Sequence, residues 1–452
     1  MKASALAGRG VTVATLLAVG LGVLLFFSGY QSLIYDAFGF AELARRLSHG
    51  GFAAAAYEWR TYGYPLFVAI CTGFRALDPK TVRLCVFLAQ LFMYLAVCAA
   101  GARMLGAIVG SSAFARAVYF ATALNPFLLA RTTETLSDSL SAVLVSLGVL
   151  LSFPPAKPPK AAPVNVARRA AASLFCVSFA TMVRPSNLAV LLAVCVLWLL
   201  RQAIWKELRI TAAPLLLAAL LLPVTPQLYS NFRAFGKLQP LVVESLYRDQ
   251  AHWGMSGLKY GAALWPGGGP QLLYRNPLYR SEPSPRAFLR ERPLAYAATT
   301  GLHLFAMFDH DLLLTYSVSA HPWYRWPLSI IDYAFLFLCL AGIVVFLRRR
   351  FSLSEPLGFA GFGLLFASAA SVSVYLPTLV ESRFSAPAEL LLTPFGVLAL
   401  ARIREIAARG DRRLLIAGAV AGALFVGSCG RLSGWIAAQA PRLAVPQAQP
   451  RA

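Results

Sequence analysis

Long apolar runs constrain the fold of this chain more than any other feature. Four of them are VTVATLLAVGLGVLLFF, FLAQLFMYLAVCAAGA, LAVLLAVCVLWLL and FLFLCLAGIVVFL. With flanking residues, each approaches the ~20 residues that a helix needs to cross ~30 Å of hydrocarbon. Apolar residues make up 58% of the chain and charged residues 13%, with a mean hydropathy of +0.64. A soluble domain has about 45–50% apolar residues and about 25% charged residues. The sequence therefore predicts an all-α polytopic membrane protein.

Basic residues between the apolar runs predict the topology. Short connections rich in Lys and Arg stay on the inner side of a membrane. All the basic clusters face inward only if residues 62–77 do not cross, and this segment is short, with Pro65 suited to a helix start. We therefore expect it at the outer interface. The inner clusters are Lys2 and Arg9; Arg103 and Arg116; Lys157, Lys160, Arg168 and Arg169; Arg201, Lys206 and Arg209; Arg348, Arg349 and Arg350; and Arg402, Arg404, Arg409, Arg412 and Arg413.

This topology gives eleven spans, with the N-terminus inside and the C-terminus outside. The spans are near 10–30, 83–106, 113–131, 136–153, 169–184, 187–204, 210–229, 327–347, 355–377, 385–403 and 413–430. Three regions follow. Residues 1–229 form an N-terminal transmembrane module with a large outer loop at 31–82. Residues 230–326 form a second outer region, in which 291–308 is an interfacial helix. Residues 327–452 hold the C-terminal transmembrane helices.

The net charge of +22 does not indicate a nucleic-acid-binding protein. The Lys and Arg residues are dispersed in small groups, with no basic arm and no stripe interleaved with aromatic residues. Charge that sets topology and attracts anionic lipid explains this pattern. The seven Cys lie in or beside apolar runs without a CxxC spacing and are interpreted as small buried hydrophobes. Asp309, His310 and Asp311 form a metal-like run, but adjacent ligands are a weak pattern, and we predict no metal there.

Asp36 lies just beyond the first apolar run, where a carboxylate is costly unless it has a function. Phe40, Leu43, Ala44 and Leu47 follow at helical spacing and make one apolar face, which Gly50 and Gly51 end. The pattern predicts a short interfacial helix that holds Asp36 at the water–lipid boundary. A solvated loop aspartate is the alternative. Arg60 lies about 20 residues further on, in a segment that also contains Tyr62 and Tyr64.

Other polar residues gather on the predicted outer side. Glu134 and Asp138 are four apart and would share a helix face, although an acid in a first helical turn also suits the helix dipole. Arginines at this boundary could hold a phosphate bidentately or snorkel to lipid headgroups. The remaining candidates are Arg184, Asn231, Glu381 and Arg383.

These motifs, taken in order, resemble the GT-C superfamily of glycosyltransferases that use polyprenyl-phosphate sugars. They are Asp36, then Arg60 with G-Y-P, L-N-P-F with T-E-T-L-S, R-P, P-x-x-x-x-N-F-x-x-F-G and E-S-R-F-x-x-P, over most of residues 30–395. The branch that resembles the chain most includes protein O-mannosyltransferases, lipid A aminoarabinose transferases and rhizobial-type lipopolysaccharide transferases.

The resemblance implies an inverting transfer of a monosaccharide from a polyprenyl-phosphate carrier to an acceptor hydroxyl on a lipid, glycan or protein. Asp36 is then the expected general base and Glu134 a second catalytic acid. Arg60, Tyr62, Tyr64, Arg184, Asn231, Glu381 and Arg383 are the expected substrate and phosphate contacts. Many relatives carry paired acids in the first loop, but Ala37 follows Asp36 here, so we predict no cofactor, with a divalent metal as the alternative.

A flippase or transporter of lipid-linked sugars is the alternative function. We disfavour it because the predicted span interiors are nearly free of charged residues and polar residues concentrate at one outer face. The Ala- and Arg-rich composition is associated with high-GC bacteria. We therefore expect the protein in a bacterial inner membrane, with its active site facing the periplasm.

Overall fold

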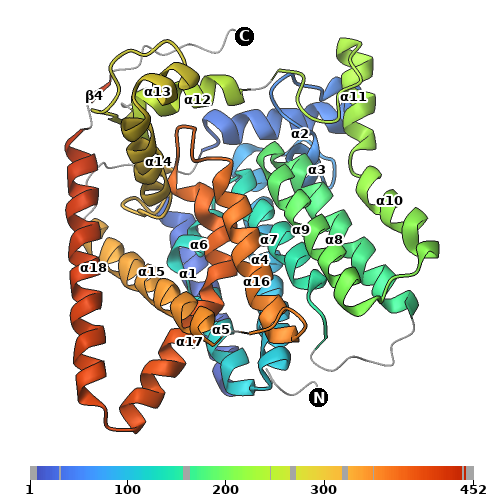
Figure 1. The fold of residues 1–452 in the computed structure, drawn as a ribbon. Helices are drawn as coiled ribbons and strands as arrows, with labels where there is room; N and C mark the ends of the chain where they lie inside the picture. Colours follow the sequence, from blue (N-terminus) through green and yellow to red (C-terminus); the bar gives the residue numbers. More distant parts are fainter. Residues whose placement is uncertain are drawn as a thin grey trace.

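The computed structural model describes residues 8–29, 32–155, 163–244, 246–264, 271–317, 324–349, 351–439 and 442–443. Helices dominate these residues and gather into a bundle, with shorter elements collected at one end (Figure 1). The basic residues Lys2, Lys157, Lys160 and Arg350 lie outside the described residues.

Eight described helices are long and apolar enough to cross a membrane. They are α1 (Arg9–Ser28), α4 (Pro79–Val109), α8 (Pro163–Val183), α9 (Leu188–Trp205), α15 (Arg325–Arg348), α16 (Pro356–Ser373), α17 (Ala386–Ala408) and α18 (Arg412–Ala438). Two bent pairs raise the number to ten: α5 (Ser112–Ala123) with α6 (Pro126–Thr132), and α10 (Ala213–Leu221) with α11 (Thr225–Phe235). The eleventh predicted span is α7 (Ser137–Ser152), whose 16 residues are short for a crossing. The helical membrane fold is confirmed, but the count of eleven is not.

The sequence L-N-P-F accounts for the 57° bend between α5 and α6. Pro126 begins α6, where its missing N–H costs nothing. The side chain of Asn125 accepts hydrogen bonds from the backbone N–H groups of Phe127 at 2.9 Å and Leu128 at 3.2 Å. It therefore acts as an N-cap, and the motif has a local structural explanation.

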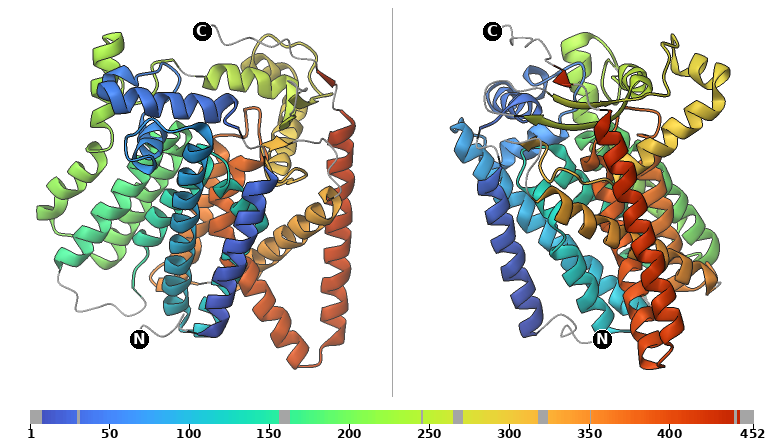
Figure 2. Two further views of the ribbon diagram at one scale, coloured as in Figure 1. Left: turned by 180° about the vertical axis from the view of Figure 1, so that it is seen from behind. Right: turned by 90° about the vertical axis from the view of Figure 1, so that its left-hand side faces the viewer.

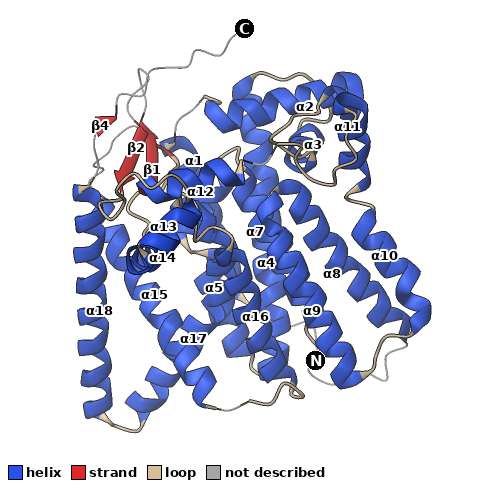
Figure 3. Cartoon of the chain, turned by 45° about the horizontal axis from the view of Figure 1, so that its top comes forward, coloured by secondary structure: helices blue, strands red, loops and turns tan. Residues whose placement is uncertain are grey.

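The short elements form a cap at one end of the bundle (Figures 1 and 3). The cap consists of α2 (Tyr35–Ala54), α3 (Gly63–Cys71), α12 (Tyr247–Ser256), β1 (Gly257–Leu264), β2 (Gln271–Arg275), α13 (Pro285–Glu291), α14 (Pro293–Met307), β3 (Tyr316–Ser317) and β4 (Arg442–Leu443). The described residues also include three 3₁₀ turns: η2 (Pro185–Asn187), η3 (Ile210–Ala212) and η4 (Ser382–Ser385). Helix α3 has nine residues, too few to cross, in agreement with the interfacial position predicted for this segment.

The strands make a small sheet in the order β3-β1-β2-β4. Strands β1 and β2 are antiparallel, with Gly257 opposite Arg275 and Tyr260 opposite Leu273. Strand β3 joins β1 in parallel and β4 joins β2 antiparallel. Strand β1 is therefore paired on both sides, which fixes the orientation of its side chains.

Helix α2 is the predicted interfacial helix. Leu43, Ala44 and Leu47 are buried and Phe40 is partly buried, which confirms the apolar face. Gly51 has a φ of 70° and kinks the helix, which then continues to Ala54. This left-handed conformation is one that glycine adopts without steric cost, so the predicted helix stop appears here as a kink.

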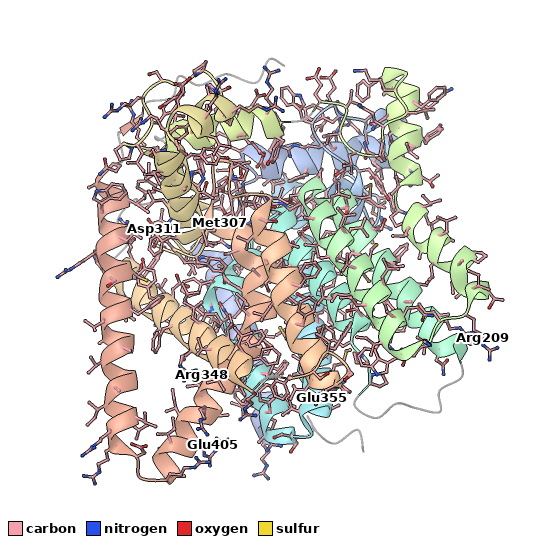
Figure 4. The ribbon with its side chains drawn as sticks, viewed as in Figure 1. Arg209, Met307, Asp311, Arg348, Glu355 and Glu405 are labelled. Atoms are coloured by element: carbon pink, nitrogen blue, oxygen red, sulfur yellow. The ribbon has the colours of Figure 1, made fainter. Side chains whose placement is uncertain are left out.

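The end of the bundle opposite the cap carries basic residues of the predicted inner clusters. Arg209 and Arg348 lie at that end in Figure 4, as does Glu405. Helix α1 runs from the same end toward the cap in both views of Figure 2. The cap and these basic residues therefore occupy opposite ends, as the predicted topology requires.

Lys259 of β1 forms buried ion pairs that link the cap to the bundle. Its Nζ donates to Asp309 Oδ2 at 3.0 Å and to Asp311 Oδ1 at 2.6 Å, and all three side chains are at most 3% exposed. Tyr333 of α15 donates to Asp309 at 2.6 Å, and Arg325 pairs with Asp311 at 3.0 Å. The ammonium of Lys259 thus occupies the position that a metal between the two aspartates would need.

Helices α15 and α17 approach closely at a glycine. A β-carbon at Gly342 would overlap the backbone carbonyl of Phe395 on α17. Small residues at such crossings let the backbones of membrane helices come together. Glycine is therefore required at this point by packing.

We predict that Gly342→Ala lowers the thermal stability of the detergent-solubilised protein, because the added methyl group forces α15 and α17 apart. Overpacking of this kind costs about 1–3 kcal/mol. Gly418→Ala on α18 is the matched control, since a β-carbon there meets nothing within 4 Å. Equal melting temperatures for the two variants would contradict the close crossing.

Candidate active site at the cap end of the bundle

Asp36 lies where two cavities meet between the cap and the bundle. The larger cavity has a volume of about 580 Å³ and the smaller about 460 Å³. The residues that line both cavities are Asp36, Gln250, Glu381, Arg383 and Phe384. The Asp36 side chain is 46% exposed, so its carboxylate is accessible to a ligand in either cavity.

Arg60 is held directly against Asp36. Its Nη2 lies 2.5 Å from Asp36 Oδ1, and its Nη1 donates to the Asp36 backbone carbonyl at 3.2 Å. The guanidinium also lies over the Phe40 ring, 4.4 Å from the centroid. A β-carbon at Gly39 would approach Arg60 Nη1 to 3.2 Å, so glycine there leaves room for the arginine. Gly39 and Phe40 of α2 thus form the surface against which the Arg60 guanidinium packs.

The backbone immediately before Asp36 is strained. Tyr35, the first residue of α2, has a φ of 47°. A non-glycine residue in this left-handed region costs roughly 1–2 kcal/mol. Strained backbone of this kind concentrates at functional sites, which adds weight to Asp36 as the centre of the site.

Arg383 links the acids around the site. It pairs with Glu381 at 2.6 Å, with Asp138 at 3.4 Å and with Asp36 Oδ2 at 3.7 Å. Asp138 also forms an ion pair with Arg184, and its side chain is only 2% exposed. Asp138 is therefore buried behind the cavity wall and orients the guanidinium groups of Arg184 and Arg383.

The two carboxyl groups that line both cavities, Asp36 and Glu381, have opposite pKa shifts. Burial alone would raise the pKa of Asp36, but Arg60, Arg383 and Arg184 outweigh it and hold that pKa below its ordinary value of 3.8. Burial raises the pKa of Glu381 above its ordinary value of 4.5, although Arg383 opposes the shift. Asp36 is thus ionised throughout the physiological range and is the better candidate for a permanent carboxylate.

The cavities differ in lining. Three guanidinium groups, those of Arg60, Arg184 and Arg383, face the larger cavity. Arg383 supplies the guanidinium of the smaller one. Both linings contain aromatic rings: Tyr35, Trp253, Tyr260, Tyr316 and Phe384 in the smaller cavity, and Phe40, Trp59, Tyr247, Tyr375 and Phe384 in the larger. An anion is therefore favoured in the larger cavity.

Most of the charged residues predicted for the site come together here. Arg60, Arg184, Glu381 and Arg383 all line the larger cavity beside Asp36. They belong to segments that are far apart in the sequence, and each lies at or beside the cap end of a helix. Their functional roles stay predictions, but their shared location is a property of the fold.

Glu134 lies in a different position from the one expected. Helix α7 begins at Ser137, so Glu134 and Asp138 do not share a helix face. Leu136 is extended, and the chain changes direction between the two acids. Glu134 is buried and accepts hydrogen bonds from Thr315 N at 2.5 Å and Thr315 Oγ1 at 3.1 Å. It lines a small neighbouring pocket with Tyr316 and not the two cavities of Asp36.

Tyr62, Tyr64 and Asn231 line neither cavity, and their expected binding roles stay predictions. The Tyr62 hydroxyl donates to the carbonyl of Pro223 at 2.5 Å, and Tyr64 is fully buried against Phe40. Both Nδ2 hydrogen bonds of Asn231 go to backbone carbonyls, and its Oδ1 accepts from Gln227 at 2.9 Å. These contacts give the three buried side chains a structural explanation.

Several lining residues could not be identified from the sequence. Gln250, Trp253 and Tyr260 come from the 230–326 region, and Tyr316 from the same region's far end. Their segment has no periodic pattern that marks a site. Within the described residues, no group of three or more His, Cys, Asp or Glu is placed to hold a metal ion.

The sequence and the fold were compared with known proteins. Residues 37–232 match the Alg9-like mannosyltransferase family, and this match begins one residue after Asp36. No curated protein sequence matches the chain significantly.

Solved structures give matches at low identity. The Archaeoglobus fulgidus oligosaccharyltransferase, in complex with zinc and sulfate, is 12% identical with a TM-score of 0.52. That alignment covers 98% of this chain and 54% of the archaeal protein, so the chain spans about half of it. ArnT from Cupriavidus metallidurans, bound to undecaprenyl phosphate, is 14% identical with a TM-score of 0.41, covering 88% of this chain and 79% of that one.

The family match and the structural likeness cover different shares of the chain. The family match includes Arg60, Asp138 and Arg184, and the likeness to the archaeal structure extends over nearly the whole chain. The chain therefore has a helical membrane fold similar to that of the archaeal enzyme, and its residues 37–232 are similar to the Alg9-like mannosyltransferase family.

We predict that Asp138→Asn markedly lowers thermal stability, because it leaves Arg184 and Arg383 without their buried partner. Breaking a buried ion pair costs about 3–5 kcal/mol. Glu42→Gln is the control: Glu42 pairs with Arg45 and Arg46 on the exposed side of α2, where such pairs contribute at most about 1 kcal/mol.

Inorganic phosphate should partly restore the stability of Asp138→Asn, since an anion in the larger cavity can pair the released guanidinium groups. Thermal unfolding with and without phosphate measures this effect. A variant as stable as Glu42→Gln, or one that phosphate does not stabilise, would contradict the role given to Asp138.

Proposed function

We propose that the protein transfers a monosaccharide from a polyprenyl-phosphate carrier to an acceptor hydroxyl, with inversion at the anomeric carbon and Asp36 as general base. The observation that carries the proposal is the position of Asp36 at the junction of the two cavities. A general base must reach the attacking hydroxyl while the leaving group departs on the other side of the reacting carbon. A carboxylate between a cavity with three arginines and a cavity with one arginine meets that requirement.

The larger cavity suits the phosphate of the donor. Arg60, Arg184 and Arg383 present three guanidinium groups to it, and arginine forks match the oxygens of a phosphate. The mannosyltransferase description of the matched family makes mannose the first sugar to test. The membrane fold supports a carrier whose lipid tail lies in the bilayer beside the bundle.

The reaction follows from this arrangement. The acceptor oxygen forms a bond to the anomeric carbon as the bond from that carbon to the phosphate oxygen breaks. The proton of the acceptor hydroxyl passes to Asp36, and the electron pair of the broken bond leaves with the lipid phosphate. The arginines stabilise the charge that develops on the leaving group. Holding both substrates against one carboxylate supplies the proximity that such a reaction needs.

The ion pairs of Asp36 suggest an order of binding. Arg60 and Arg383 face Asp36 in this structure and lower its pKa, which makes it a weak base. A donor phosphate would compete for the same guanidinium groups. Its arrival would raise the pKa of Asp36 and increase its basicity, so the donor would bind before the acceptor is activated.

The orientation in the membrane is also part of the proposal. The basic end of the bundle carries Arg209 and Arg348, opposite the cap, and such residues favour the cytoplasmic side. The cap and its cavities would then face the periplasm of a bacterial inner membrane. Acceptors on this side are hydroxyl groups of lipids, glycans or proteins.

A flippase or transporter needs a polar route through the bilayer. The expectation of charge-free span interiors is wrong in part, because Asp332 of α15 and Glu389 of α17 are buried in the bundle. Both lie in the cap-side third of their helices, and His310 pairs with Glu389 at 2.5 Å. These acids sit near the cap, so they favour a site at one face over a route across the membrane.

We predict that Asp36→Asn lowers the transfer rate by about 10²–10⁴-fold while the protein still folds, because the amide keeps the shape but not the basicity. Transfer from polyprenyl-phosphate mannose by the purified protein measures it. Glu42→Gln, on the exposed face of the same helix, should retain normal activity.

The pH profile separates Asp36 from Glu381 as the base. A base loses activity as the pH falls through its pKa. If Asp36 is the base, kcat/KM for the donor should fall only below pH 3.8, because the pKa of Asp36 is lowered. If Glu381 is the base, kcat/KM should already fall at a pH above 4.5, because the pKa of Glu381 is raised. An acid limb well above pH 4.5, together with an active Asp36→Asn variant, would transfer the role to Glu381.

We further predict that Arg60→Ala weakens binding of the lipid-linked sugar by about 10–100-fold. A hydrogen bond to a charged group contributes about 1.5–3 kcal/mol, and about 1.4 kcal/mol is tenfold. Arg45→Ala is the control, since Arg45 is on α2 with a 54% exposed side chain. Transfer from a nucleotide sugar without a lipid carrier would overturn the proposed donor.

A further inference from the structure

We propose that the smaller cavity is a binding site for a neutral sugar ring, so that the acceptor is a carbohydrate and not a peptide or a phosphorylated lipid. This inference rests on the proposed function, because it assigns the acceptor to the side of Asp36 opposite the donor phosphate. The side chains that carry it are Tyr35, Trp253, Tyr260 and Tyr316, together with Gln250.

The walls of the cavity match the two kinds of surface on a pyranose. One face of a sugar ring presents C–H groups that pack flat on aromatic rings, and its edge presents hydroxyl groups. Tyr35 and Tyr316 stack with ring centroids 6.2 Å apart and an angle of 24° between their planes, which makes a continuous aromatic wall. Trp253 is 50% exposed and adds a large ring to the same cavity. Aromatic walls with a few placed polar groups are typical of small-molecule sites.

Neutral hydrogen-bonding groups of the cavity are free to bind sugar hydroxyls. Among the described residues, the side-chain polar groups of Gln250, Trp253, Tyr260 and Tyr316 have no hydrogen-bond partner. Burial raises the pKa of both Tyr260 and Tyr316, so their phenols stay protonated and can donate. An amide, an indole N–H and two phenols provide donors and acceptors without charge.

The charge of the cavity disfavours an anionic acceptor. Two carboxylates, Asp36 and Glu381, line it with one guanidinium, that of Arg383. The larger cavity has the same two carboxylates and three guanidinium groups. A phosphorylated acceptor would therefore meet net negative charge in the smaller cavity, whereas a neutral sugar would not.

The backbone at Tyr260 disfavours a peptide. Extended peptides often bind by adding a strand to a free sheet edge. Tyr260 offers no such edge, because it pairs with Leu273 of β2 on one side and its N–H donates to the Val380 carbonyl at 2.8 Å. Helix α12 and strands β1 and β2 belong to the cap and do not span the membrane. The acceptor is thus expected to enter from the aqueous side, as a glycan can.

Mannobiose, a neutral disaccharide, tests the inference by saturation-transfer NMR on the full-length protein in detergent. We expect transfer to its ring protons with the wild type and with Trp253→Phe, which keeps an aromatic wall. The transfer should be lost in Trp253→Ala and retained in Trp326→Ala, the control, whose tryptophan is 58% exposed and lines neither cavity.

Kinetics with saturating polyprenyl-phosphate mannose provide the second readout. Trp253→Ala should raise the KM for mannobiose about tenfold, because aromatic contacts contribute about 0.5–1.5 kcal/mol beyond the area they bury. Its kcat and its binding of the lipid-linked donor should stay near wild type. These results together would support the assignment of the smaller cavity to the acceptor.

Two failures are distinguishable. If the wild type binds the lipid-linked sugar but transfers it to a Ser/Thr hexapeptide and not to mannobiose, the acceptor inference is wrong and the proposed function stands. If the wild type binds no lipid-linked sugar while mannobiose still contacts Trp253, the sugar site stands and the proposed donor is wrong. An unchanged mannobiose signal in Trp253→Ala overturns the inference in either case.

Discussion

The rest of the site depends on the ion pairs of Arg383. Its guanidinium contacts Glu381, Asp138 and Asp36, which reach it from three separate parts of the chain. A buried carboxylate such as Asp138 is costly without a cation, and the arginine in turn needs these acids. Each charge is therefore held in place by the others, and the balance leaves Asp36 accessible between two cavities of different chemistry.

The position of the cap relative to the bundle sets the shape of the smaller cavity. Lys259 is adjacent to Tyr260 in β1, and its buried partner Asp311 lies four residues before Thr315. Glu134 holds the same segment from the bundle side through its hydrogen bonds to Thr315. Two buried polar anchors thus hold Tyr260 and Tyr316. The hydrogen bonds of Glu134 give it a structural explanation, and its catalytic role stays a prediction.

Local physics made several features predictable. The apolar runs identified the helices, because length and hydropathy suffice to recognise a membrane helix. The spacing of Leu43, Ala44 and Leu47 identified the buried face of α2. The bend between α5 and α6 was not predicted, since residues 113–131 were expected to form one span. The ordered motifs indicated the GT-C class. The functions of Tyr62, Tyr64 and Asn231 were not predictable, since an aromatic or amide side chain near a site is equally suited to support it or to line it.

The sequence alone determined that the chain is a polytopic helical membrane protein, that Asp36 lies at a helix boundary and that charged residues gather toward one end of the bundle. These properties depend on hydropathy and helical periodicity, which act over short stretches of chain. Only the tertiary structure decided that Arg60, Asp138, Arg184 and Arg383 converge on Asp36 and that the 230–326 region completes an aromatic cavity. Ion pairs and cavity walls depend on distances between segments that no local pattern encodes, so they become visible only when the helices and the cap are packed together.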